Sequence, residues 1–157
     1  MEDEMRISGL SHVGLYVRDL EGMTKFYQGI LQLVESHRNE GRMVFLTADK
    51  EREEHEVVLV QGRDGDAKIV QQLSFRVPSV DDVLSYFREF KRLNVPIDST
   101  VSHGAGVSCY FRDPEGNRLE VFADVEVEGG RGYAGTLDLE KTADELVAQV
   151  RSSAAVV

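Results

Sequence analysis

The spacing of apolar residues follows one order twice along the chain. Alternate residues from Val13 to Val17 are apolar, as in a strand with one buried face, and the spacing then becomes helical as far as Ile30. The order recurs from Leu73, with His12 aligned on Gln72 at an offset of 72 − 12 = 60 residues and no gap. The pattern predicts two copies of a strand followed by an amphipathic helix.

Capping residues mark where the predicted helices begin. Asp19 precedes the first helical segment and has the side chain of an N-cap. Ser79 and Asp82, behind Pro78, resemble a capping box at the start of the second. Each copy therefore changes from strand to helix at a defined point.

Three short strand candidates follow each predicted helix. A hairpin turn is expected at residues 113–117, because Asp-Pro-Glu-Gly-Asn places proline and glycine as tight turns require. Each copy is therefore predicted to be a βαβββ unit. The strand candidates are Val34–His37, Arg42–Thr47 and His55–Gln61 in the first copy, and Asp98–Ser102, Val107–Arg112 and Arg118–Ala123 in the second.

A single βαβββ unit leaves one sheet face bare, so two units are expected to pair. We predict an α+β fold in which two modules form an open eight-stranded cup with the helices outside. One domain is expected over residues 1–124, with module one at 8–61, a linker at 62–69 and module two at 70–124. In the tail, 125–157, glycines including Gly135 predict a flexible stretch, and Thr142 with Glu145 predicts a helix near 142–152.

The amino-acid composition argues against several classes of protein. Apolar residues make up 41% and charged residues 29% of the 157 positions, which is ordinary for a folded domain. A net charge of −10 argues against nucleic acid or an anionic membrane as partner. The apolar runs fall short of the ~20 residues of a membrane span. A single cysteine, Cys109, expected to pack on the helix side, excludes an internal disulfide and fits a cytoplasmic location.

Alternation also predicts which side chains face away from the helices. Leu15 and Val17 pack toward the helix, which places His12 on the opposite, more polar face together with Gln72 of the second copy. A pseudo-twofold relation between the copies brings His12 and Gln72 together, and Glu120 can reach the same point. Imidazole, amide and carboxylate are suitable ligands for a divalent cation, and three protein ligands leave positions open for substrate.

These residues lie in segments that resemble the vicinal oxygen chelate superfamily, which includes glyoxalase I, bleomycin- and fosfomycin-resistance proteins and extradiol catechol dioxygenases. The resemblance covers roughly residues 8–124 and implies paired modules, a metal ion in the cup and a substrate that chelates it through two neighbouring oxygens. It is carried by Gly9-Leu10-Ser11-His12-Val13, Val17-Arg18-Asp19-Leu20, Phe26-Tyr27, Phe75-Arg76-Val77 with Asp81-Asp82, and the run from Tyr110 to Phe122.

The resemblance also implies roles for individual residues. His12 and Glu120 match the metal ligands of the first and last strands, and Gln72 stands where the dioxygenases place a histidine. Leu59 falls near the place of a ligating glutamate in glyoxalases, which favours an open three-ligand site. His55 resembles the acid–base histidine of the dioxygenases, and Tyr110 resembles the tyrosine that binds their substrate. His103 lies in a region that contributes a further histidine in those enzymes. His37 is expected on the surface.

The leading hypothesis is therefore an extradiol dioxygenase that cleaves a catechol-like small molecule. The expected cofactor is Fe(II), with Mn(II), Zn(II) or Ni(II) as alternatives. A glyoxalase-like isomerase or lyase with Glu120 as base stays open, as does a non-catalytic protein that binds a drug or aromatic ligand. We expect a homodimer, with the modules paired either within a chain or between chains.

Overall fold

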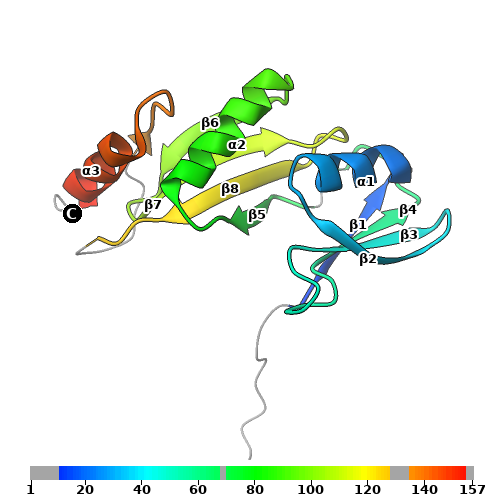
Figure 1. Cartoon of the computed structure of the whole chain (residues 1–157). Helices are drawn as coiled ribbons and strands as arrows, with labels where there is room; N and C mark the ends of the chain where they lie inside the picture. The colour runs from blue at the N-terminus through cyan, green and yellow to red at the C-terminus, as the bar shows by residue number, and fades with distance from the viewer. Residues whose placement is uncertain (1–10, 68–69, 128–134, 155–157) are drawn as a thin grey trace, which may run out of the picture. The chain divides into compact units, whose positions relative to one another are not determined.

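The computed structural model describes residues 11–67, 70–127 and 135–154, and it divides into two compact units, Met1–Asp66 and Ala67–Val157. Each unit contains one sheet with an amphipathic helix packed on one face (Figure 1). Two sequence predictions, the motif residues Gly9 and Leu10 and the glycines at 129, 130 and 132, lie outside the described residues.

The first unit is a mixed four-stranded sheet with one helix. Its elements are β1 (Val13–Val17), α1 (Leu20–Gly29), β2 (Val34–Asn39), β3 (Met43–Thr47) and β4 (Val57–Gln61). The strands lie in the order β1-β4-β3-β2, with β1 parallel to β4 and the other pairs antiparallel. The predicted βαβββ unit is confirmed, with strand ends that differ by one or two residues.

The second unit repeats this topology and adds one strand. Its sheet has the order β5-β8-β7-β6-β9, and β5 is again parallel to its neighbour β8. The α+β fold is confirmed, and pairing of the modules into a cup stays a prediction. The elements are β5 (Leu73–Arg76), α2 (Val80–Arg92), β6 (Ile97–Ser102), β7 (Gly106–Arg112), β8 (Arg118–Asp124), β9 (Gly135–Thr136) and α3 (Ala143–Ala154).

Strand β9 corrects two sequence-based expectations. Gly135, assigned to a flexible stretch, pairs with Ser102, so the second sheet has a fifth strand and the described sheets exceed the predicted eight strands. A strand of two residues, Gly135–Thr136, is too short to show an alternation of apolar and polar side chains in the sequence. These two residues form a strand because the outer edge of β6 offers unpaired backbone groups.

The helix starts follow their predicted caps. The Asp19 carboxylate accepts a hydrogen bond from the Gly22 amide at 2.9 Å, and Ser79 Oγ accepts one from the Asp82 amide at 3.2 Å. In the first turn of α3, Glu145 accepts a hydrogen bond from the Thr142 amide at 2.8 Å. The predicted turn is also present, since Asp113 Oδ1 accepts from the amides of Glu115 and Asn117 at 2.9 Å.

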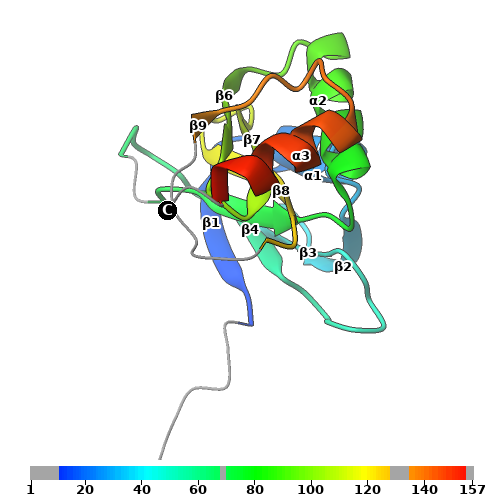
Figure 2. The same ribbon diagram turned by 90° about the vertical axis from the view of Figure 1, so that its left-hand side faces the viewer.

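The core of the second unit lies between α2, α3 and the sheet. The fully buried ring of Phe90 on α2 lies 4.2 Å from the ring of Phe111 on β7, measured between centroids. Helix α3 packs against α2 and β7 (Figure 2) and buries Leu146, Val150 and Ala154. The tail helix therefore belongs to the core of this unit.

Replacement of Phe90 tests this core. We expect Phe90→Ala to lower the free energy of unfolding by about 3–5 kcal/mol, because it removes buried apolar surface and leaves a cavity against Phe111. Leu93, 40% exposed at the end of α2, provides the control, and Leu93→Ala should change the value by about 0.5 kcal/mol or less. Urea denaturation measures both, and equal effects would contradict the assignment of Phe90 to the core.

The single cysteine is buried on the helix side of β7, as predicted. Cys109 is fully buried, and burial raises the pKa of its thiol to about 12. Since the thiolate is the reactive form, this thiol is chemically inert at neutral pH. Cys109 therefore has a packing role.

The helices are short. They contain 10 residues in α1, 13 in α2 and 12 in α3, whereas a span of the hydrocarbon core takes about 20. Within the described ranges, then, no helix has the length and apolar character to cross a membrane.

Candidate metal and substrate site

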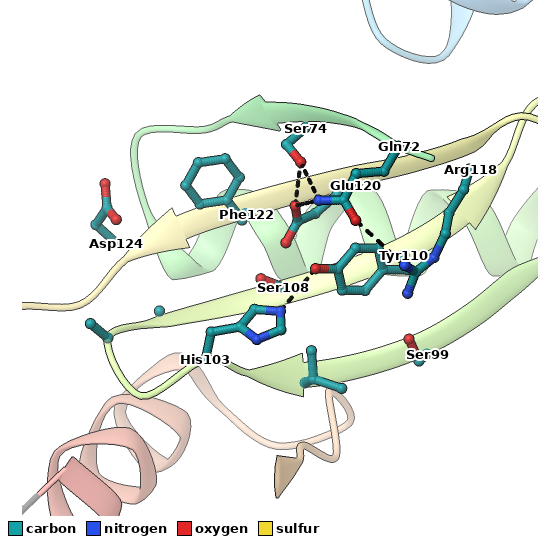
Figure 3. Close-up of a pocket in the computed structure, with 13 residues that line it drawn as sticks. Gln72, Ser74, Ser99, His103, Ser108, Tyr110, Arg118, Glu120, Phe122 and Asp124 are labelled. Carbon is teal, nitrogen blue, oxygen red and sulfur yellow. Dashed lines mark hydrogen bonds between the residues drawn. The ribbon is translucent and has the colours of Figure 1, made fainter. Parts of the chain in front are cut away.

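The sheet of the second unit carries a hollow of about 590 Å³ on the face turned away from α2 (Figure 3). Side chains of β5, β6, β7 and β8 and of the loop between β6 and β7 line it. The predicted alternation is confirmed here: Leu119 and Val121 of β8 are buried toward the helix, and Glu120 and Phe122 line the hollow.

Glu120 forms the centre of a small polar cluster. Its side chain is buried, with 5% of the residue exposed, and β5 places Ser74 directly beside it in the sheet register. Ser74 Oγ donates a hydrogen bond to Glu120 Oε2 at 2.5 Å, and Gln72 Nε2 donates to the same oxygen at 3.3 Å. These two donors carry no charge, and a buried carboxylate with such neutral donors is a suitable ligand for a cation.

Sequence reasoning missed Ser74 as a site residue. It lies on β5, two positions after Gln72, which directly precedes the strand, and both side chains line the hollow. That two-residue spacing was the available signal. What it could not show was the parallel pairing of β5 with β8, which places Ser74 against Glu120.

Tyr110 and His103 form a second polar pair in the hollow. Tyr110 lies on β7 opposite Glu120, and its hydroxyl is 2.8 Å from Nε2 of His103 (Figure 3). Burial raises the pKa of the Tyr110 phenol, and the negative charge of Glu120 raises it further. The phenol therefore stays protonated at neutral pH and can donate a hydrogen bond to a bound oxygen.

His12 and His55 lie together in the first unit. Their ring centroids are 4.3 Å apart, and the ring of Phe45 lies 5.1 Å from that of His55. His37, expected only as a surface residue, is exposed but stacks on Phe45 at 3.9 Å. His55 precedes the first residue of β4, so strand alternation does not fix which face its ring occupies.

The surroundings of His55 favour one tautomer. In the described part of the chain, Nδ1 of His55 is buried without a hydrogen-bond partner, and it lies 3.8 Å from a carboxylate oxygen of Glu54. A nearby carboxylate favours the tautomer that carries its proton on Nδ1. Nε2 is then left as the basic nitrogen.

The predicted metal ligands come from both units. Gln72 and Glu120 are brought together in the second, and the approach of His12 from the first stays a prediction. Among the described residues, no three His, Cys, Asp or Glu side chains form a metal-binding group, and the predicted set differs from such a group by including the amide of Gln72. Its Oε1 accepts from Arg118 Nη1 at 3.4 Å, so ligation through Oε1 requires the amide group to turn over.

The sheet registers locate the counterpart of Glu120 in the first unit. Ser74 pairs with Glu120 in the second unit, and its equivalent in the first unit, Gly14, pairs with Val58. Leu59 pairs instead with Leu15 and is buried toward the helix. Val58, rather than Leu59, therefore occupies the equivalent position. It too is apolar, so this position offers no fourth ligand.

The fold and the cluster define a class: proteins built from two βαβββ modules whose open sheet faces carry polar side chains. Residues 9–121 match the profile of the Glyoxalase/Bleomycin resistance protein/Dioxygenase superfamily. The chain belongs to this superfamily. The resemblance drawn from the sequence motifs is thereby confirmed.

The curated relatives of this chain include dioxygenases. Biphenyl-2,3-diol 1,2-dioxygenase 3 of Rhodococcus globerulus is 29% identical over 123 residues, which cover 73% of this chain and 63% of the relative. The chain thus spans less than two thirds of the length of the curated relatives it matches.

Two solved structures share the fold. An integron cassette protein from the Halifax Harbour sewage metagenome is 28% identical, with a TM-score of 0.64 over 74% of this chain and 99% of that one. An E126Q mutant of the fosfomycin resistance protein FosX from Listeria monocytogenes, complexed with Mn(II) and 1S,2S-dihydroxypropylphosphonic acid, is 26% identical. Its TM-score is 0.61 over 85% of this chain and 95% of that one.

Proposed function

We propose that this protein is a metal-dependent enzyme whose substrate binds through two vicinal oxygens, and that its reaction is the extradiol cleavage of a catechol by O₂. The observation that carries the proposal is the hollow in which a buried carboxylate, Glu120, lies beside a protonated phenol, Tyr110, that contacts His103. The similarity to a biphenyl-2,3-diol dioxygenase supports the choice of reaction.

The residues present fit a divalent cation. Glu120 supplies the negative charge, and Gln72 and His12 supply neutral donors, so the three ligands would leave a charge of +1 on the site. A singly deprotonated catechol would neutralise that charge. When bound, Fe(II) supplies open coordination positions for the diol and for O₂.

The other residues would handle protons and orientation. Nε2 of His55 would accept the proton of one catechol hydroxyl and later return it, which is the role of a general acid–base. Tyr110 would donate its O–H to a substrate oxygen, and His103 would orient that phenol. In the overall reaction both atoms of O₂ enter the product and one ring C–C bond beside the diol breaks, so no net proton or electron is required.

A second candidate is a glyoxalase-like isomerase or lyase with Glu120 as base. Gln72 favours it, because an amide oxygen is a weaker donor than imidazole and suits harder cations. The fosfomycin resistance protein of 26% identity that holds Mn(II) supports a harder cation at this site, without indicating the reaction. Non-catalytic binding of a drug or aromatic ligand fits less well, because it gives no role to the buried carboxylate of Glu120 in the hollow.

Metal analysis combined with O₂ consumption tests the proposal. We expect the purified protein to hold about one divalent metal per pair of modules and, loaded with Fe(II), to consume O₂ with catechol and form a yellow ring-opened product. Chelation should abolish both signals, and Fe(II) should restore them.

Bound Mn(II), Zn(II) or Ni(II) without O₂ consumption would support the isomerase instead. Metal-free protein that binds aromatic ligands tightly would support the binding protein. Light scattering tests the homodimer that the sequence analysis expects.

A further inference from the structure

Arg118 is the cation of the hollow. At the start of β8 it lines the cavity with 27% of its side chain exposed, and it is the only lysine or arginine among the described lining residues. Its guanidinium carbon lies 3.9 Å from the centroid of the Tyr110 ring, and Nη1 donates to Gln72 Oε1 at 3.4 Å (Figure 3). Arg118 thus contacts two residues of the proposed site.

The charge of Arg118 is only partly balanced. Its nearest carboxylate oxygen is Asp98 Oδ2, 3.6 Å from Nε, and the same oxygen lies 2.5 Å from Nη2 of Arg112. Two arginines therefore share one carboxylate, and Arg112 has the close contact. The resulting cluster keeps a positive charge beside the hollow.

With a metal ion bound at Glu120, the remaining charges of the hollow would not cancel this one. Asp124 pairs with Arg76 at 2.9 Å, and Glu120 is the proposed metal ligand. The chain as a whole has a net charge of −10, which repels small anions from most of its surface. An anionic ligand would thus need a local cation in order to enter, and Arg118 provides it.

We propose that Arg118 binds a carboxylate group on the substrate, so that the preferred substrates are catechols bearing a carboxylate. This inference rests on the proposed function. A guanidinium offers a planar pair of N–H donors that matches the two oxygens of a carboxylate. The amide of Gln72 lies between Arg118 and Glu120, 3.4 Å from Nη1 of the one and 3.3 Å from Oε2 of the other. In either orientation of this amide, a group attached to a metal-bound catechol ring would lie within reach of the guanidinium.

Matched substrates test the inference on the Fe(II)-loaded protein. We expect kcat/KM for the better of 2,3- and 3,4-dihydroxybenzoate to exceed that of its carboxamide by about tenfold or more, since a charge-assisted hydrogen bond contributes at this level. Arg118→Met should remove this preference, mainly by raising KM for the carboxylate. Arg118→Lys should restore part of it, and the control Arg112→Met should keep most of it.

A merely structural role of Arg118 predicts a different result. If the guanidinium only positions Tyr110, Arg118→Met lowers kcat equally for carboxylate and carboxamide, and that result overturns the inference. Calorimetric titration with benzoate and benzamide separates this failure from failure of the proposed function. Selective benzoate binding that is lost in Arg118→Met supports the anion site even without catechol cleavage. Equal binding of both ligands by the wild-type protein overturns it.

Discussion

Glu120→Gln protein is expected to fold normally and to lose its metal. The substitution keeps the shape of the buried side chain but removes the negative charge that Glu120 would contribute to the proposed set of ligands. Substitution of residues that merely orient ligands costs about 10- to 100-fold in metal affinity, so loss of the charged ligand should cost at least about 100-fold. Titration with Fe(II) or Mn(II), followed by elemental analysis, measures the change, and O₂ consumption should fall with it.

Ser74→Ala is the matched control for this prediction. It removes the hydrogen bond to Glu120 Oε2 at 2.5 Å but leaves the carboxylate in place. We expect a loss of affinity of about 10- to 100-fold, smaller than that of Glu120→Gln. Thermal unfolding of the metal-free proteins verifies that both variants fold. Unchanged metal content in folded Glu120→Gln would remove Glu120 from the site.

His55→Gln protein is expected to bind metal normally and to lose most of its turnover. If Nε2 of His55 takes the catechol proton, an amide cannot replace it, and general acid–base catalysis contributes about 100- to 10,000-fold in rate. The ring contact with His12, at 4.3 Å between centroids, places this base beside a proposed ligand. Steady-state kinetics with catechol should therefore show a fall in kcat, with metal content measured in parallel.

His37→Gln distinguishes a specific role from a general disturbance of this cluster. The His37 ring lies 6.3 Å from that of His55, and its Nδ1 is 3.7 Å from the carboxylate of Glu54. Since His37 is exposed and has no proposed contact with substrate, we expect less than about a threefold change in kcat. Equal losses in the two variants would contradict the acid–base role of His55.

The alternation of apolar residues was sufficient to predict both βαβββ units, because each strand buries one face under a helix and each helix buries one stripe. It also predicted the faces of β7 and β8, on which Tyr110 and Glu120 lie. The helix starts at Asp19, Ser79 and Thr142 were predictable for a local reason, since a cap satisfies amides within three residues of itself.

Other features depend on contacts between distant segments. Ser74 becomes part of the site only because β5 pairs with β8, and Val58 replaces Leu59 as the counterpart of Glu120 through the register of β1 and β4. The strand at Gly135 exists because an edge of β6 is free to pair with it. The spacing of apolar and polar residues within these strands does not predict which strand each one pairs with.

The sequence by itself determined the class of this protein: its repeat, its superfamily motifs and the candidates His12, Gln72 and Glu120, since these depend on short-range periodicity and residue type. The tertiary structure decided which side chains meet. It joined Glu120 to Ser74 and Gln72, Tyr110 to His103, and His55 to His12, and it placed Arg118 against Tyr110. The physical reason is that strand pairing and ring packing depend on the whole core. The chemical properties of a buried group such as Glu120 depend in turn on the groups that the fold places around it.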